Sequence, residues 1–154
     1  MIAVLLSLFL TTQTPGHLPA DCAEAANTLE INACAARDLS RETERMDHYL
    51  TAARRNADAM DQATAGTPDA SSQRDHLDKA QAAWTAYADV VCDGVYDRWK
   101  GGTIRTVAAL RCRIDMTRER TRVVWRDYLS PADASPPDLP EPLRPASEEL
   151  QYED

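Results

Sequence analysis

Apolar and small residues recur at helical spacing along much of this 154-residue chain. In the stretch from Ala35 to Met60 they follow one another at alternating steps of four and three, the spacing of one buried helix face. The seven positions are Leu39, Thr43, Met46, Leu50, Ala53, Ala57 and Met60. The pattern predicts a long helix that packs against a partner, with the charged residues between these positions, Glu42 among them, facing solvent.

A second helix is predicted after a loop at residues 63–72, which contains Gly66 and Pro68. Ser72 or Ser71 is a suitable N-cap for it. Its apolar positions again repeat at steps of three and four, and they are Leu77, Ala80, Trp84, Tyr87, Ala88 and Val91. A connection as short as this loop favours two antiparallel helices.

A third helix is predicted to run from a cap at Thr103 to about Leu129, after a break at Gly101-Gly102. Its apolar side includes Ile104, Val107, Leu110, Ile114, Val124, Trp125 and Tyr128. Residues 21–32 are alanine-rich and predict a short helix before the first long one. The fold class that follows is all-α: a small disulfide-stapled bundle of three main helices plus a short N-terminal helix, over residues 21–130.

The N-terminal end of the chain resembles a targeting segment. Residues 2–10 form an apolar run of the length of a signal-peptide core, too short to cross a bilayer. We therefore expect residues 1–20 to be a signal peptide, although no Lys or Arg precedes the run. Because Asp21 rather than a small residue precedes Cys22, we expect no stable membrane anchor. The expected location is periplasmic or secreted.

The C-terminal end is rich in proline. Six prolines fall within fifteen residues from Pro131 onward. Proline cannot continue a helix, and such a composition buries too little apolar surface to order itself. The sequence therefore predicts a Pro-rich, acidic, disordered tail over residues 131–154.

The net charge of −8 is unevenly distributed along the chain. The predicted tail has seven acidic residues and one basic residue, so residues 21–130 are nearly neutral, with 18 acidic and 16 basic residues. Residues 21–97 hold 15 acidic and 7 basic residues, whereas residues 98–127 hold 9 basic and 3 acidic. The first two helices are thus acidic and the third is basic. An overall acidic chain lacks the field that phosphate binding needs, so no nucleic acid partner is expected.

Four cysteines, Cys22, Cys34, Cys92 and Cys112, indicate disulfides in a small chain that we expect to be exported. Their spacing lacks the close pairs of a zinc site, so no metal is expected. On one straight helix Cys22 and Cys34 would be about 18 Å apart, so pairing them needs a turn near residues 30–33. We favour this pairing together with Cys92–Cys112. The pairing of Cys22 with Cys92 and Cys34 with Cys112 stays open.

The residues show no pattern typical of catalysis. His48 and His76 fall on polar helix faces, far apart in sequence, without a neighbouring carboxylate and nucleophile. Paired acids such as Asp58 and Asp61 fall on faces that we expect to be solvated. We expect no catalytic residue, no cofactor and no enzyme activity.

Three sets of residues together resemble a known family. They are Cys22, Glu30, Asn32, Cys34 and Ala35, then Ala80-Gln81, Trp84, Tyr87, Asp89 and Cys92, then Gly102, Cys112, Thr117 and Arg120. In this order they are similar to the lysozyme inhibitor LprI-like domain family of exported bacterial proteins, over residues 22–129. The chain departs from the family pattern at Ala88, where Arg is usual, and along the first long helix. The resemblance implies a helical periplasmic or secreted domain and, for the family's namesake, binding and inhibition of lysozyme.

Three aromatic residues are candidates for contact with a partner. Trp84 and Tyr87 share the apolar side of the second helix, where burial in the core is the simpler interpretation and a binding hot spot is the alternative. Trp99 falls in a connection, where binding residues concentrate. We also expect a structural ion pair between Asp89 and Arg120.

Two functions follow from these observations. The first is a protein-binding domain that inhibits lysozyme. The second is a periplasmic envelope interaction or structural module with a different protein partner and no lysozyme activity.

Overall fold

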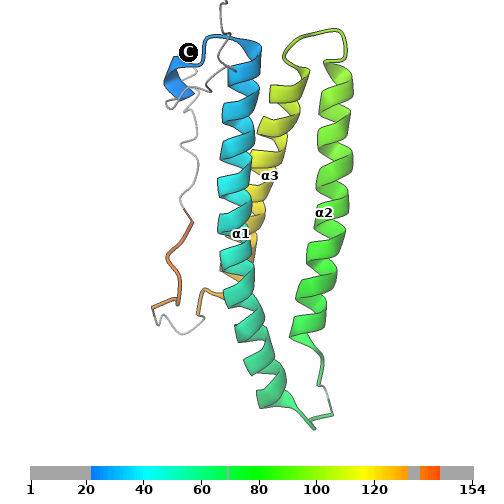
Figure 1. Ribbon diagram of the computed structural model, residues 1–154. Helices are drawn as coiled ribbons and strands as arrows, with labels where there is room; N and C mark the ends of the chain where they lie inside the picture. The colour runs from blue at the N-terminus through cyan, green and yellow to red at the C-terminus, as the bar shows by residue number, and fades with distance from the viewer. Residues whose placement is uncertain (1–21, 69, 132–135, 143–154) are drawn as a thin grey trace, which may run out of the picture.

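The computed structural model describes residues 22–68, 70–131 and 136–142. It contains a 3-10 turn η1 (Cys22–Glu24) and three helices, α1 (Thr28–Thr64), α2 (Gln73–Arg98) and α3 (Arg105–Tyr128). Consecutive helices run antiparallel in one bundle, and the described residues contain no strand (Figure 1). The predicted all-α bundle of three main helices is confirmed. The predicted signal peptide lies outside the described residues.

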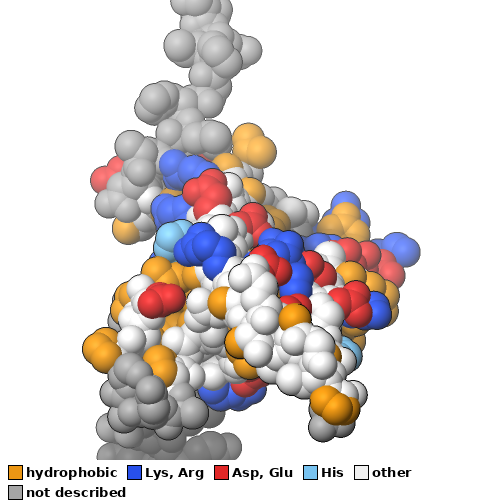
Figure 2. Space-filling model, turned by 90° about the horizontal axis from the view of Figure 1, so that it is seen from below, with side chains coloured by type: hydrophobic (Ala, Val, Ile, Leu, Met, Phe, Trp, Pro, Cys, Tyr) orange, Lys and Arg blue, Asp and Glu red, His pale blue; other side chains and the backbone are white. Residues whose placement is uncertain are grey.

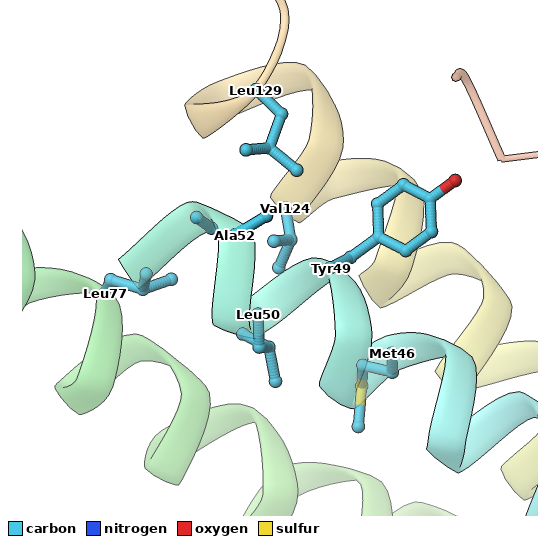
Figure 3. Close-up of a cluster of buried hydrophobic side chains, with 8 residues drawn as sticks. Met46, Tyr49, Leu50, Ala52, Leu77, Val124 and Leu129 are labelled. Carbon is cyan, nitrogen blue, oxygen red and sulfur yellow. The ribbon is translucent and has the colours of Figure 1, made fainter. Parts of the chain in front are cut away.

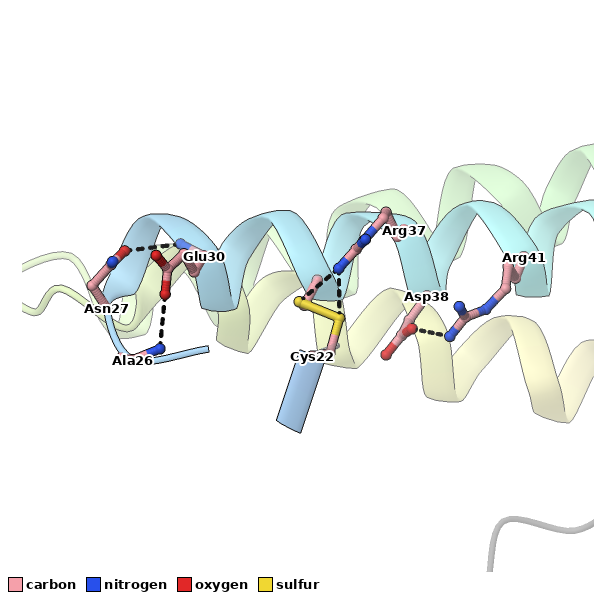
Figure 4. The surroundings of a disulfide bond; sticks show 8 residues. Cys22, Ala26, Asn27, Glu30, Arg37, Asp38 and Arg41 are labelled. Carbon is pink, nitrogen blue, oxygen red and sulfur yellow. Dashed lines mark hydrogen bonds and ion pairs between the residues drawn. A yellow bond between two sulfur atoms is a disulfide. The ribbon is translucent and has the colours of Figure 1, made fainter. Parts of the chain in front are cut away.

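Helix α1 begins earlier than the sequence analysis predicts. The Asn27 side chain accepts a hydrogen bond from the Glu30 N–H at 3.0 Å, and the Glu30 carboxylate accepts one from the Ala26 N–H at 2.8 Å. This reciprocal cap satisfies N–H groups where the helix begins. The predicted short N-terminal helix is present only as the 3-10 turn η1. The chain reverses just before Thr28 rather than at residues 30–33 (Figure 4).

Both favoured disulfides are present. Cys22–Cys34 joins η1 to α1 with a Cα–Cα distance of 5.7 Å, and Cys92–Cys112 joins α2 to α3 at 5.6 Å. The Arg37 guanidinium donates to the sulfur atoms of Cys22 at 2.8 Å and of Cys34 at 3.1 Å (Figure 4). The second bridge therefore links two packed helices, whereas the first holds a short turn against one helix.

The core lies where α1 is covered by both other helices. Leu50 and Ala53 of α1, Leu77 of α2 and Val124 of α3 belong to one buried cluster (Figure 3). Most of the predicted face of α1 is buried, but its last residue, Met60, is 52% exposed. The side chain of Asn56 hydrogen-bonds the carbonyl of Tyr128, the last residue of α3. Met60 lies one turn further along α1, beyond the end of α3.

Part of the proline-rich segment packs against the bundle. The Trp125 indole N–H donates to the Leu139 carbonyl at 2.9 Å, and the Tyr49 hydroxyl donates to the Pro140 carbonyl at 2.8 Å. Leu139 also packs against the core cluster. Prolines lack an N–H donor but keep the carbonyl acceptor, which is the group used here. Residues 136–142 thus contact α1 and α3, and the predicted domain boundary and the disorder of the remaining tail stay predictions.

The N-terminus of α2 is capped by two side chains. Ser72 accepts from the Asp75 N–H at 3.1 Å, as predicted, and Asp61 of α1 accepts from the Gln73 N–H at 2.6 Å. Burial alone would raise the pKa of Asp61. Hydrogen bonds from Gln73, from the Ser72 hydroxyl and from the Arg74 N–H outweigh this effect and lower the pKa.

Ion pairs extend the contact between α1 and α2 at this end. Asp78 accepts from Arg74 Nε at 2.7 Å and from Arg54 Nε at 2.8 Å, and Arg74 also reaches Asp58 at 2.8 Å. The hydrogen bonds from Arg74 and then Arg54 lower the pKa of Asp78. Acidic and basic side chains accordingly lie side by side on the end of the bundle seen in Figure 2.

None of the described helices is long and apolar enough to cross a membrane.

Candidate partner-binding surfaces

The three predicted aromatic residues occupy different environments. Trp84 is half-buried and packs against the core cluster, whereas Tyr87 is 62% exposed and Trp99 is 45% exposed. The simpler interpretation of Tyr87 as a core residue is therefore wrong. Tyr87 directly precedes the buried Ala88, and adjacent residues differ by about 100° around a helix. Since α1 and α3 cover only one side of α2, Tyr87 faces outward.

The expected pair between Asp89 and Arg120 is also wrong. Asp89 pairs with Arg113, and Arg120 Nε donates instead to the Gln81 side chain at 2.9 Å. The disulfide between α2 and α3 explains why Asp89 meets Arg113 and not Arg120. It fixes an antiparallel register in which Asp89 lies near Arg113, while Arg120 is about two turns further along α3. The hydrogen bond to Asp89 raises the pKa of Arg113, and burial lowers that of Arg120.

A small groove with a volume of about 250 Å³ opens between the helices beside Trp84. Its lining comes from all three helices, with Leu39 and Thr43 on α1, Trp84 on α2 and Thr117 on α3. The Asp89–Arg113 pair forms part of its rim. This groove is mainly apolar, but Trp84 is engaged in core packing there, which favours a structural role for this side chain.

Exposed apolar side chains gather at the end of the bundle where α2 joins α3. Of the eight large hydrophobic side chains exposed among the described residues, five belong to this end, which is uppermost in Figure 1. They are Leu29, Ile31, Tyr96, Trp99 and Ile104. We call these five residues the apolar tip. Leu29 and Ile31 lie in the first turn of α1, and the others lie at the end of α2 and in the connection to α3.

The connection that carries Trp99 is held by short-range contacts. The Gly102 N–H donates to the Trp99 carbonyl at 2.8 Å, and the Arg105 guanidinium lies 5.2 Å from the centre of the Tyr96 ring. The predicted cap at Thr103 is wrong, because Ile104 occupies the N-cap position and provides no side-chain hydrogen bond. The N–H groups of the first turn of α3 therefore lack a side-chain cap.

The connection from α2 to α3 gives the apolar tip several basic side chains. Residues 98–114 contain five basic residues and no acidic one. Lys100 is well exposed, with 77% of its side chain accessible, and Asp97 approaches it only to 3.9 Å. The start of α3 adds the positive end of a helix dipole. The connection thus combines exposed apolar groups with basic side chains, while Glu30 and Asp97 add acidic groups at the same end of the bundle.

One buried charge was not anticipated from the sequence. Glu42 is only 7% exposed, and its carboxylate accepts from Arg118 Nε at 3.0 Å and lies 3.3 Å from Arg45. The available signal was a second stripe along α1, with Ala35, Glu42 and Tyr49 spaced by seven residues. A helix packed between two partners needs two such stripes. The pair of Glu42 and Arg118 ties α1 to α3.

The described residues contain no group of three or more His, Cys, Asp or Glu side chains that could hold a metal ion. What the geometry offers is surface for binding: the apolar tip, the groove beside Trp84 and the outer face of α2. The tip is the largest gathering of exposed apolar side chains among the three.

Comparisons with known proteins give one family and one relative. The family model described as "Lysozyme inhibitor LprI" matches residues 20–123. A protein of Rhizobium meliloti (strain 1021), named "Uncharacterized protein R02472", is 30% identical over 126 residues, which are 75% of this chain and 86% of the relative. No solved structure matches the chain.

Proposed function

The chain belongs to the lysozyme inhibitor LprI family, and from this membership we propose that it is an exported protein that binds and inhibits lysozyme through its apolar tip. The family is one of inhibitors rather than enzymes. The two disulfides support a periplasmic or secreted location, because such bonds persist in oxidising compartments. Lysozymes that attack the cell wall act in the same compartments.

The observation that carries the choice of surface is the exposure of Trp99 among the other apolar residues of the tip. Aromatic residues surrounded by further apolar contacts are the usual centre of a protein interface. Trp99 lies in a connection between helices, at the end of a narrow bundle. A projecting end of this kind suits a concave partner, and the substrate cleft of a glycoside hydrolase is concave.

Charge supports the same partner. The cleft of such an enzyme carries two carboxyl groups beside the bond that it cleaves. Lys100 and Arg105 are near Trp99 and would meet these carboxyl groups with opposite charge. The net charge of −8 on the whole chain would in addition speed encounter with a basic enzyme.

The test is inhibition of c-type, g-type and i-type lysozymes on a cell-wall suspension by the purified, oxidised protein. We expect inhibition of at least one type at sub-micromolar concentration. Trp99→Ala and Lys100→Glu should each weaken inhibition at least tenfold, since each removes a contact at the tip. A version lacking residues 143–154 should keep its inhibition at equilibrium, because the acidic residues that it loses affect the rate of encounter rather than the contacts at the tip.

Two variants provide matched controls. Tyr87→Ala removes an aromatic side chain of α2 that is more exposed than Trp99, at 62% against 45%. Lys79→Glu reverses a lysine whose side chain is 72% exposed, close to the 77% of Lys100. Both should inhibit like the unaltered protein. Equal losses in the control and tip variants would move the site away from the tip. No inhibition of any lysozyme by folded protein would favour the envelope interaction module instead.

A further inference from the structure

The outer face of α2 carries a second apolar pattern that no part of the described chain covers. Six positions on it follow one another at steps of four and three, and all six are exposed. They are His76, Ala80, Ala83, Tyr87, Val90 and Gly94. Tyr87 is 62% and Val90 is 74% exposed, and a Cβ atom added at Gly94 would meet nothing within 4 Å. A regular step of four and three is the spacing of a helix that packs on another helix.

We propose that this outer face binds the same face of a second copy of the chain, with the two α2 helices antiparallel. The proposal does not depend on the lysozyme hypothesis, because the surface is separate from the apolar tip. Its first support is the order of large and small residues. In one antiparallel register Tyr87 packs on Ala83 of the second copy, and Val90 packs on Ala80. His76 then packs on Gly94, so each larger side chain meets a small one.

Charge supports the same register. In an antiparallel helix pair, a residue directly beside the contact stripe faces a residue on the same side of the stripe in the other helix. Lys79 and Asp93 lie on the same side of the stripe, so this register sets Lys79 opposite Asp93 of the second copy. The two side chains are 72% and 73% exposed, respectively. Between residues 80 and 97 the helix has three Asp residues and no Lys or Arg. Opposite charges therefore meet at both ends of the pair.

A parallel pair of the same faces is less favourable. It would place Tyr87 on Tyr87 and Val90 on Val90, while Ala83 and Gly94 would face their own copies across a gap. It would also separate Lys79 from Asp93 of the second copy, so the contact between these opposite charges would be lost. The antiparallel arrangement removes the steric conflict and keeps the opposite charges together.

The size of the face indicates how strong the association is. Helix α2 has 26 residues, so it is about 39 Å long, and with a width of about 10 Å it offers on the order of 400 Å² per copy. A standard stable interface uses about 800 Å² per partner. We therefore expect a weak dimer that dissociates in the micromolar range.

The first experiment is sedimentation equilibrium of the oxidised protein over about 1 to 500 µM. We expect a reversible monomer–dimer equilibrium, weakened at least fivefold by Lys79→Asp and by Asp93→Lys. Each variant places like charges opposite each other. An equimolar mixture of the two variants restores both opposite-charge contacts, so the mixture should dimerise at least as well as the unaltered protein.

The second experiment tests the register by cross-linking. The register places Ala86 close to Ala86 of the second copy, beside the two-fold axis, with an offset of only about 3 Å along the helix direction. The Ala82 positions are six residues, or about 9 Å, apart along the helix direction, and they lie further from the contact between the helices. Ala86→Cys should therefore form an intermolecular disulfide readily on mild oxidation, and the matched control Ala82→Cys should form little.

Three results would overturn the proposal. One is a protein that stays monomeric at 500 µM. Another is a dimer that survives both charge reversals unchanged. The third is equal cross-linking of Ala82→Cys and Ala86→Cys, which would indicate a parallel or unspecific pair. Circular dichroism of each variant checks that it is folded, and both cysteine positions are exposed on the same helix.

Discussion

Removing the two disulfides one at a time should have unequal effects on stability. The perturbations are Cys22→Ala with Cys34→Ala, and Cys92→Ala with Cys112→Ala. The bridges close loops with sequence separations of 12 and 20 residues. Loop-closure entropy alone gives about 3 kcal/mol for either bridge. On loop length alone, the two double variants should therefore be nearly equal.

The native structure makes them different. The η1 turn has no buried residue, so without its bridge it can detach while the three helices stay folded. The detached turn then gains conformational entropy in the native state as well, which offsets much of the entropy that the unfolded state gains. The loss of stability is therefore limited to the free energy that holds η1 against α1. We expect about 1 kcal/mol or less. Cys92 is fully buried between packed helices, so the other variant should lose about 3 kcal/mol or more, including a cavity term.

The assay is urea unfolding at pH 7 and 25 °C, followed by circular dichroism at 222 nm, with the free energy taken by linear extrapolation. Limited proteolysis near residues 22–27 should increase only in the variant that lacks Cys22–Cys34. Equal losses of about 3 kcal/mol in the two variants would refute the argument that η1 detaches locally.

Three further predictions concern polar contacts. Arg118→Met should destabilise the protein by about 1–3 kcal/mol in the same assay, because it leaves Glu42 buried with only Arg45 nearby; no loss would show that Glu42 is solvated. Tyr49→Phe should cost about 1 kcal/mol and speed hydrogen exchange at residues 136–142, since it removes the hydrogen bond to the Pro140 carbonyl. The pKa of Asp61 is lower in the folded protein than in the unfolded chain, so its ionised form stabilises the fold above about pH 4, and this stability is lost as the pH falls through the folded pKa. In Asp61→Asn the urea midpoint should therefore fall less steeply as the solution is acidified.

The helices were predictable because each has a strong periodic pattern. The seam through Leu50 and Ala53 and the cap at Ser72 follow from spacing and residue type alone. For the disulfides, spacing favoured the observed pairing but did not exclude the alternative. The start of α1 was missed although Asn27 and Glu30 form a recognisable cap sequence. The residues on both sides of this cap are rich in alanine and favour a helix equally, so the sequence does not show where the chain reverses. The position of the reversal before Thr28 follows only from the folded structure, in which Cys22 bonds to Cys34.

The surfaces were less predictable because they depend on how many neighbours each helix has. Periodicity assigns Tyr87 an apolar face but does not say that α2 has neighbours on one side only. The pairing of Asp89 likewise depends on the register between α2 and α3, which shifts its partner from Arg120 to Arg113. Trp99 was correctly placed in an exposed connection, since the Gly-Gly break after it marks the end of a helix. Its exposed neighbour Leu29, far away in sequence, could be found only from the fold.

The two proposed surfaces have different geometric consequences. In the antiparallel register Trp99 of one copy lies 28 residues along the helix pair from Trp99 of the other, which is about 42 Å. The two apolar tips would therefore point in opposite directions, each free to contact its own partner. Dimer formation should then leave inhibition per chain unchanged, so Tyr87→Ala is a sound control for the tip even though it alters the dimer face. An inhibitory strength that rises with dimer fraction would contradict this arrangement, because it would require the two surfaces to act on one enzyme together.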